Sequence, residues 1–427
     1  MPAAAAAETP TFPPLSDCVG QLRRELPSKV KPETFDEYTA QAQDLRPAID
    51  SATRSQPEFQ QTIWDYITRR VNDQRMAPGR EIMKNEAAAL QAIEQRLGVD
   101  GPTTVGVYGV ETDYGRVRGS YPVVDATLGR ACLNLQAADR KEHFFTALWL
   151  LQEGVVRPEE FKGSWAGAFG LTQFMPATFV RTMTSADGSS RPDIIHSVPD
   201  ALATTARYLR QLGWVPGVPW AVEVKVPLDL ARQWNAPESE HACLGESAST
   251  GKCRRVAQWA VDGVTRVDGR PLVRTDGPID AFEPLTNAAL LMPAGAQGPA
   301  WLVTANYQAV WRYNRADAYA LAIGLLSDAY RGAPPQRVPW PTDDAGLSRT
   351  EFIELQSLLR QLGHCDMVVD GVPGPKTAAA IRDEESKLGN VPTGRGGQKL
   401  LAALRKVEPS TACGPATGAS QPVATTD

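Results

Sequence analysis

The stretch Gly109-Val110-Glu111-Thr112-Asp113-Tyr114-Gly115 places Glu111 directly after an uncharged run and closes on a glycine. Because residues 105–110 carry no charge, a carboxylate at this point is poorly hydrated and its neutral form is favoured. If Pro102 starts a helix and Gly115 ends it, Glu111 also lies near the negative end of the helix dipole, which raises its proton affinity. A valine-rich run also fits a buried strand, so the helix is one of two interpretations. The segment predicts a carboxyl group that can donate a proton.

About fifty residues later the chain reads KGSWAGAFGLTQFMP, residues 162–176. This segment is rich in glycine and carries an amide, Gln173, beside an aromatic ring, Phe174. An amide can both donate to and accept from sugar hydroxyl groups, and an aromatic ring offers a face for a sugar to stack on. Together with the acid, the loop indicates glycan cleavage.

Each of these residues also has a structural interpretation. Glu111 fits a buried carboxylate paired with Arg116 or Arg118, since structural ion pairs also perturb pKa values. Ser164 fits a small residue in a tight turn, and Phe174 fits a core residue, which is the commoner fate of aromatic side chains.

From Cys18 to about Tyr330 the chain resembles the membrane-bound lytic transglycosylase B family of bacterial cell-wall enzymes. Separated motifs that occur in one order are more specific than any single motif. The segments that carry the resemblance are SQPEF at 55–59, ETDYG at 111–115, the loop at 162–176, SVPDA at 197–201, GW at 213–214, and the block from NY at 306–307 through RYNR at 312–315 to YA at 319–320.

The resemblance implies a mechanism with one carboxyl group, whereas an ordinary glycosidase uses two, about 5 to 9.5 Å apart. Glu111 would protonate the leaving oxygen, the N-acetyl group of the substrate would stabilise the cationic centre, and Glu111 would then take a proton from the C6 hydroxyl. The product would be a 1,6-anhydromuramoyl end. Asp113 would point away from Glu111 on a helix, so we interpret it as a solvated or capping residue. A lysozyme-type hydrolase and an inactive wall-binding scaffold are the alternatives.

The resemblance also implies the residues that bind the glycan. Ser164 would lie near the N-acetyl group, where an uncharged donor steadies developing charge. Gln173 and Phe174 would line the same groove, and Tyr313 and Asn314 would supply a hydroxyl and an amide. The last candidate, Tyr307, stands where relatives often carry phenylalanine.

No cofactor is implied, but relatives can carry a calcium loop shortly after the QFMP segment. Here residues 185–193 offer only Asp187 and Asp193 as obvious carboxylates, with Arg191 and Pro192 between them. A calcium loop needs oxygen ligands at alternating positions and a bidentate acid at its end. We therefore expect an ordinary polar turn and no metal.

Apolar periodicity ending at glycines predicts a mainly helical fold, a lysozyme-like catalytic domain over residues 16–330. Alternating runs such as Val222-Glu223-Val224-Lys225-Val226 predict a small strand-bearing subdomain inserted at 220–300. A proline-rich linker at 331–345 leads to residues 346–408, which resemble the peptidoglycan-binding domain 1 family, a three-helix module. Where that family continues with an aromatic residue and a glutamine, this chain has Glu384-Glu385, so a spacer or docking unit is the alternative. The segments 1–15 and 409–427 are expected to be disordered.

Composition limits the class of protein. The chain has 427 residues with 42% hydrophobic and 22% charged content, which is typical of two or three folded units. A net charge of -5 gives no reason to expect nucleic-acid binding, and no segment is long enough to span a bilayer. Peptidoglycan glycan strands are the expected partner, and proteins of cell-wall synthesis or division are further candidates.

Export is the expectation that follows from such a substrate. Residues 1–14 lack the apolar region of a signal peptide and no lipobox is present, so we expect that a leader was removed, Met1 was added and the protein is periplasmic. Six cysteines fit an oxidising compartment. Cys243 with Cys253 is the first expected pair, followed by Cys18 with Cys132 and Cys365 with Cys413, and six unpaired thiols are the alternative.

Overall fold

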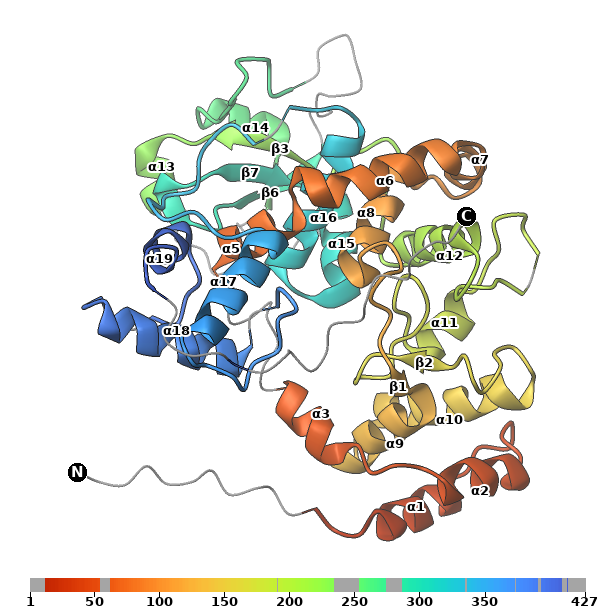
Figure 1. The fold of residues 1–427 in the computed structure, drawn as a ribbon. Coiled ribbons are helices and arrows are strands. Elements are labelled where there is room, and N and C mark those ends of the chain that lie inside the picture. Colours follow the sequence, from red (N-terminus) through yellow and green to blue (C-terminus); the bar gives the residue numbers. More distant parts are fainter. Residues whose placement is uncertain are drawn as a thin grey trace, which may run out of the picture. The chain divides into compact units, whose positions relative to one another are not determined.

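The computed structural model describes residues 12–53, 62–189, 191–233, 253–273, 286–334, 336–372, 374–390, 393–408 and 413. These residues belong to two compact units, one of Met1–Arg54 and Pro78–Gln211, the other of Ser55–Ala77 and Leu212–Asp427. Both units are mainly helical, as predicted (Figure 1). Among the described residues, no helix combines the length and apolarity that a bilayer crossing requires. The domain boundaries expected from the sequence stay predictions.

The first unit is a helical domain with one small sheet. Two short strands, β1 (Tyr121–Pro122) and β2 (Lys162–Gly163), pair antiparallel. The helices are α1 (Leu15–Arg24), α2 (Pro32–Ala40), α3 (Arg46–Thr53), α7 (Ala87–Leu97), α8 (Gly101–Thr112), α9 (Val123–Leu133), α10 (Ala138–Gln152), α11 (Pro176–Thr182) and α12 (Val198–Gln211), while α6 (Asp73–Asn85) crosses the boundary between the units.

Glycines end two of these helices as the sequence predicted. Gly98 caps α7 with φ 68°, and Gly154 follows α10 with φ 62°. Both values lie in the left-handed region, where a glycine avoids the strain that a β-carbon would cause. The Cys18–Cys132 disulfide, also predicted, joins α1 to α9.

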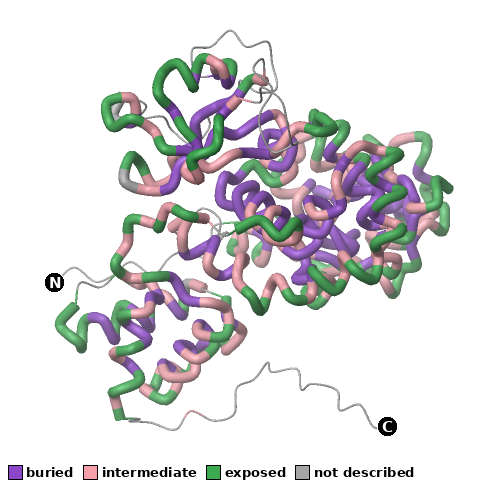
Figure 2. The backbone as a smooth tube through the Cα atoms, turned by 90° about the horizontal axis from the view of Figure 1, so that it is seen from above, coloured by how far each residue is buried: buried purple, intermediate pink, exposed green. Residues whose placement is uncertain are grey.

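Helix α8 is the buried centre of the first unit. Asp100 caps it by accepting from the Thr103 N–H at 2.9 Å, and Pro102 lies in its first turn. Nine of its twelve residues are buried, and it packs against α7 and α12. The valine-rich run is therefore a helix and not a strand. Elsewhere, too, buried residues gather where helices and strands pack, and exposed residues lie on loops and along helices (Figure 2).

The second unit contains a five-stranded antiparallel sheet in the order β4-β6-β7-β3-β5. Its strands are β3 (Ala221–Lys225), β4 (Cys253–Arg255), β5 (Thr265–Arg266), β6 (Asn287–Leu291) and β7 (Ala300–Val303). Trp259 packs under the sheet and donates its indole N–H to the Ala288 carbonyl at 3.0 Å. Cys243 lies outside the described residues, and with it the predicted Cys243–Cys253 pair.

The helices of this unit divide into two groups. Around the sheet lie α5 (Ile63–Arg70), α13 (Leu228–Gln233), α14 (Val256–Val261), the 3-10 helix η2 (Gly295–Gln297), α15 (Ala305–Asn314) and α16 (Asp317–Tyr330). The C-terminal module follows with α17 (Arg349–Gln361), α18 (Pro375–Lys387) and α19 (Gln398–Leu404).

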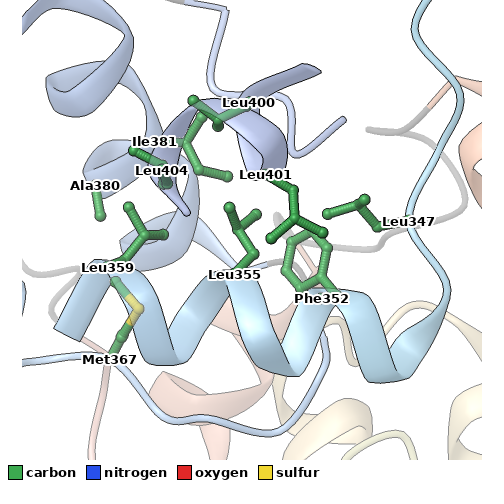
Figure 3. Packing of buried hydrophobic residues seen from close by; sticks show 10 residues of the cluster. All are labelled: Leu347, Phe352, Leu355, Leu359, Met367, Ala380, Ile381, Leu400, Leu401 and Leu404. Carbon is green, nitrogen blue, oxygen red and sulfur yellow. The ribbon is translucent and has the colours of Figure 1, made fainter. Parts of the chain in front are cut away.

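The C-terminal module has its own hydrophobic core. Phe352, Leu355 and Leu359 from one face of α17 meet Ile381 of α18 and Leu401 of α19 (Figure 3). Spacings of three and four residues put such side chains on one face of a helix. The predicted three-helix arrangement is confirmed, and so is the Cys365–Cys413 disulfide.

Glu384 and Glu385 are both buried in this module, at 4% and 7% exposure. Glu384 accepts from Lys387 Nζ at 2.8 Å and contacts His364 Nε2 at 2.7 Å. Glu385 accepts from the Thr393 hydroxyl and the Gly394 N–H. Buried charges are tolerated when they are paired and hydrogen-bonded, so Glu384 and Glu385 fit the interior of the module as members of a polar network.

The C-terminal module also contacts helix α5 within the second unit. Arg395 donates from Nε and Nη2 to the two carboxylate oxygens of Asp65, at 2.7 and 2.8 Å. The Asp65 side chain is only 4% exposed, and Arg395 also bridges to Asp344. The guanidinium of Arg69 lies 4.8 Å from the centre of the Phe352 ring, and burial lowers its pKa to about 10.

The segment between α16 and the module is held in place as well. The Glu223 carboxylate on β3 accepts from the N–H groups of Arg337 and Val338. Trp340 packs between Trp64 and Trp301, with ring centres 6.4 and 6.0 Å away. In the part of this linker that the structure describes, side chains fix the chain against the sheet and α5.

Candidate active site

Glu111 lies half-buried in the last turn of α8. The next residue, Thr112, is fully buried, and its hydroxyl donates to the Leu171 carbonyl at 2.6 Å and accepts from the Gly115 N–H at 3.0 Å. One threonine therefore joins the end of the glutamate helix to the glycine-rich loop, whose conformation sets the surroundings of the carboxyl group.

The turn after Glu111 is tighter than the sequence suggested. The helix ends at Thr112, and Asp113 and Tyr114 both adopt left-handed backbone angles, with φ 51° and 56°. The Tyr114 ring folds back on the helix, where a β-carbon at Gly109 would lie 2.6 Å from it. Left-handed non-glycine residues cost of order 1–3 kcal/mol each and gather at functional sites.

Asp113 differs from the expectation of a solvated residue. It occupies the helix C-cap, but its side chain is buried, 3.9 Å from the Arg116 guanidinium. The left-handed turn tucks the carboxylate inward instead of leaving it on the outer face of a helix. It has little surface at which an attacking water could bind.

Backbone hydrogen bonds build the glycine-rich loop. The Ser164 N–H donates to the Ala168 carbonyl at 2.8 Å, and the Ala168 N–H donates to Ser164 Oγ at 3.1 Å. Phe169 and Phe174 exchange backbone bonds of 3.0 and 2.9 Å. A β-carbon at Gly163 would lie 2.0 Å from the Ala168 oxygen, so only glycine fits there. Ser164 thus closes a turn while its hydroxyl proton stays available for donation.

Gln173 connects this loop to the glutamate turn. Its backbone is left-handed, with φ 52°, and its amide NH2 donates to the carbonyls of Gly170 and Arg118 at 2.9 and 3.2 Å. Within the described residues its amide oxygen accepts no hydrogen bond. Both amide protons are used in these bonds, so Gln173 can offer only its amide oxygen, an acceptor, to a ligand. The sequence had suggested that it could donate as well.

Arg118 extends the same connection. Its guanidinium donates to the Gly115 carbonyl at 3.0 Å and to the Ile195 carbonyl at 2.8 Å. Arg118 was expected only as a possible ion-pair partner of Glu111, and the structure shows it joining the glutamate turn, Gln173 and the segment before α12.

Two expected ligand contacts are corrected by burial. Phe174 is 1% exposed and packs on Tyr208 with ring centres 5.7 Å apart, so its face is not open to a sugar, and the core interpretation describes it. Tyr307 is also 1% exposed and donates its hydroxyl to Asp317 Oδ1 at 2.8 Å.

Tyr313 and Asn314 end helix α15 in the second unit. Tyr313 is half-buried and stacks on Tyr319, with ring centres 6.2 Å apart, while Asn314 is exposed. The next residue, Arg315, is left-handed with φ 45°. Among the described residues, the non-glycine positions with left-handed φ are Asp113, Tyr114, Gln173 and Arg315, and all four lie in the motifs singled out from the sequence.

Two basic side chains beneath the loop, Arg130 and His143, lie outside the motifs found in the sequence. Arg130 on α9 donates to the Ala166 carbonyl at 3.2 Å and approaches Met175 Sδ at 3.9 Å. His143 on α10 accepts the Ala177 N–H on Nδ1 at 3.3 Å, and burial, with Arg130 nearby, lowers its pKa to about 4. Helical periodicity could place them on inward faces, but only the tertiary fold brings them under the loop.

Oxygen atoms of the turn at 185–193 already have hydrogen-bond partners within the protein. The Arg96 guanidinium donates to the carbonyls of Ser185 and Ala186, at 2.7 and 3.1 Å. The Asp200 carboxylate accepts from the Ala186 and Asp193 N–H groups. A calcium site would need these oxygens as ligands.

Asp187, the other carboxylate of this turn, is also engaged. It accepts from the Ser185 hydroxyl and the Ser189 N–H, and these bonds lower its pKa to about 2. Over the described part of the turn, the available oxygen atoms do not form a ligand set that fits calcium. That the turn binds no metal stays a prediction.

Comparison with known proteins places these features in a family. The sequence model described as Transglycosylase SLT domain matches residues 15–328, and a peptidoglycan binding domain model matches residues 348–404. The chain is 28% identical over 249 residues to Membrane-bound lytic murein transglycosylase B of Escherichia coli (strain K12). That match covers 56% of this chain and 60% of the relative, which is less than two thirds of its length.

Comparison with solved structures points to the same family. SltB3 from Pseudomonas aeruginosa, in complex with NAG-anhNAM-pentapeptide, is 34% identical with a TM-score of 0.66, over 92% of this chain and 99% of that one. The Escherichia coli lytic transglycosylase Slt35, in complex with calcium, shares the fold at 22% identity and a TM-score of 0.58, over 76% of this chain and 94% of that one. The family resemblance inferred from the motifs is confirmed, and this chain belongs to the Transglycosylase SLT domain family and carries a C-terminal peptidoglycan binding domain.

Proposed function

We propose that this protein is a lytic transglycosylase, which cleaves the β-1,4 bond between MurNAc and GlcNAc in peptidoglycan without water and leaves 1,6-anhydromuramoyl ends. The observation that carries the proposal is the position of Glu111, half-buried in the last turn of a buried helix and tied through Thr112 to the glycine-rich loop. The family membership supports it.

In this mechanism Glu111 acts twice. As an acid it protonates the glycosidic oxygen that leaves, and as a base it then removes the proton of the C6 hydroxyl, whose oxygen attacks C1 of the same sugar. The substrate's own N-acetyl group stabilises the cationic centre between the two steps. No proton is gained or lost by the protein over the cycle.

The neighbouring residues have matching roles. Gln173 would accept a hydrogen bond from a sugar hydroxyl or amide, because its own amide protons are already used. Ser164 would donate its hydroxyl proton near the N-acetyl group, and Tyr313 and Asn314 would supply further polar contacts. We assign Phe174 to the core of the first unit and Tyr307 to the core of the second, since neither ring is accessible.

The hydrolase alternative needs a second carboxylate and a positioned water. Asp113 is the sequence neighbour that could serve, and its burial at 5% exposure argues against that role. We further propose a periplasmic location, where such a substrate lies, with the C-terminal module binding glycan strands and raising the local concentration of enzyme at the wall.

Mass spectrometry of muropeptides released from purified sacculi tests the proposal. We expect anhydro products from the full chain and about a thousandfold slower release by Glu111→Gln, since a general acid-base residue contributes up to that order. The matched control is Glu153→Gln, the same change at an exposed glutamate that caps α10, which should keep full activity. Products that carry an added water would establish the hydrolase, and an active Glu111→Gln protein would refute the mechanism.

A further inference from the structure

The first unit contains a cavity that none of the roles above uses. It has a volume of about 230 Å³ and lies between the end of α10 and the segment before α12. Its apolar walls include Val156, Phe179 and Ile194, all of them buried. Small-molecule sites combine an apolar floor with a few polar groups that fix orientation.

The rim of this cavity carries charges of both signs. Arg157 donates from Nε to Glu160 at 2.8 Å, and Glu160 also contacts His196 Nε2 at 3.1 Å. Arg191, exposed on the rim, has no hydrogen-bond or ion-pair partner among the described residues. The Asp193 carboxylate accepts from the N–H groups of Ile195 and His196, both at 2.9 Å. Such a rim suits a ligand with carboxylates and an ammonium group, joined by small apolar parts.

The cavity wall is attached to the candidate active site within the same unit. The Ile194 carbonyl accepts from the Leu171 N–H at 2.8 Å, and the Leu171 carbonyl accepts from the Thr112 hydroxyl at 2.6 Å. The Ile195 carbonyl binds the guanidinium of Arg118. Two hydrogen bonds thus separate the cavity wall from the residue that follows Glu111.

Peptidoglycan supplies a ligand with this chemistry. Its stem peptide, attached to MurNAc, combines alanine methyl groups with a glutamyl carboxylate, a dibasic residue and a terminal carboxylate. Five extended residues reach up to about 17 Å, which allows a stem on a sugar beside Glu111 to reach a neighbouring cavity.

We propose that this cavity binds the peptide stem of peptidoglycan, with Arg157 and Arg191 receiving its carboxylates and the Val156, Phe179 and Ile194 surfaces receiving its alanine methyl groups. This inference rests on the proposed function, because it assigns the peptide part of the same substrate. It makes the two arginines specificity-determining residues, which act through substrate binding and take no part in proton transfer.

A binding titration tests the site without catalysis. The probe is a synthetic stem pentapeptide with glutamyl, dibasic and terminal D-alanyl residues, added to the full chain carrying Glu111→Gln and followed by calorimetry. We expect a Kd at least about tenfold weaker in Arg157→Ala with Arg191→Ala, since each hydrogen bond to a charged group contributes about that factor. Arg24→Ala on α1, which removes an exposed arginine of the same unit, should leave the Kd unchanged. An equal Kd in all three proteins would overturn the proposal.

Turnover separates this proposal from the one it rests on. Glycan strands with and without their stem peptides are compared, the second set prepared by amidase digestion. We expect the double arginine variant to lose kcat/KM about tenfold or more on peptide-bearing strands, and to match the parent protein on stripped strands. Equal losses on both substrates would refute the peptide site. If no anhydro product appears with either substrate, the proposed function fails, and the titration still decides whether the cavity binds the peptide.

Discussion

The glycine-rich loop of the first unit and the contact between α5 and the C-terminal module in the second unit are stabilised in opposite ways. The loop is closed by backbone hydrogen bonds among residues 163–174, and at Gly163 two backbone segments lie too close for a β-carbon. The module is joined to α5 by a charged pair, Asp65 with Arg395, separated by 330 positions in the chain. The contacts of the loop join residues that are close in the sequence, so a local pattern can indicate them. The Asp65–Arg395 pair joins distant residues and forms only when the chain has folded.

The largest effect is expected where the loop is tightest, at Gly163→Ala. The added β-carbon would lie 2.0 Å from the Ala168 carbonyl oxygen, so the backbone of the loop must move. We expect a loss of about 3 kcal/mol in the free energy of unfolding, as for severe overpacking. Because Ser164 and Gln173 move with the loop, anhydro-muropeptide release should fall at least about a hundredfold.

The matched control for that variant is Gly20→Ala in α1, where no atom lies within 4 Å of the added carbon. Alanine favours a helix over glycine by up to about 1 kcal/mol, so this change should stabilise the protein slightly. Chemical denaturation gives both values. A Gly163→Ala protein as stable and active as the parent would show that the loop is not held by close backbone contact.

The second effect comes from the buried ion pair. Asp65→Ala leaves the Arg395 guanidinium with Asp344 as its remaining ion-pair partner. Because Arg395 is also 24% exposed, we expect this change to cost about 2 kcal/mol, below the usual range for a fully buried pair. Arg395→Ala should cost a similar amount, and the double variant should cost less than the sum of the two. A double-mutant cycle in urea measures the coupling, and strict additivity would mean that the pair does not join the module to α5.

A pH series probes the polar groups beneath the loop. Burial lowers the pKa of His143 from 6.5 to about 4, so on acidification the unfolded chain takes up the proton before the folded one. The stability contributed by neutral His143 is complete above about pH 6.5 and declines as the pH falls towards 4. Melting temperatures of the parent protein should therefore fall over this window more steeply than those of His143→Gln, whose amide oxygen can accept the Ala177 N–H without titrating. Parallel curves would refute this assignment.

The same division explains what could be predicted from the sequence. Helix stops at Gly98 and Gly154 and the strand at 221–225 followed from local patterns, because periodicity and glycine act within a few residues. The glutamate segment remained open between helix and strand, because a valine-rich run fits both. Burial of Phe174 and Tyr307 did not follow, since an aromatic residue on a helix or loop faces a core or a groove according to what packs against it. The contacts that Arg130 and His143 make beneath the glycine-rich loop could not be predicted either, because only the folded chain brings these residues together.

The backbone of the site shows a second limit of local patterns. Tyr114 and Gln173 adopt left-handed angles that their residue types do not favour, so propensity alone would not assign them, whereas aspartate, the residue at 113, adopts such angles more readily. Surrounding contacts, such as the Gln173 amide bonds to Gly170 and Arg118, stabilise these angles. The motifs indicated where the candidate site lies in the sequence. The left-handed backbone angles of its non-glycine residues became visible only in the structure.

The smallest effect is expected at a surface pair that copies the geometry of the buried one. Arg405 donates from Nε and Nη2 to both carboxylate oxygens of Glu354 at 2.8 Å, but the two side chains are 48% and 43% exposed. Water and salt screen such a pair, so Arg405→Ala should lower the free energy of unfolding much less than Arg395→Ala does. Urea titrations at low and high salt, run beside those of Arg395→Ala, compare two bidentate pairs that differ mainly in burial. If both arginines contributed equally, hydrogen-bond geometry and not burial would control how much a charged pair stabilises this unit.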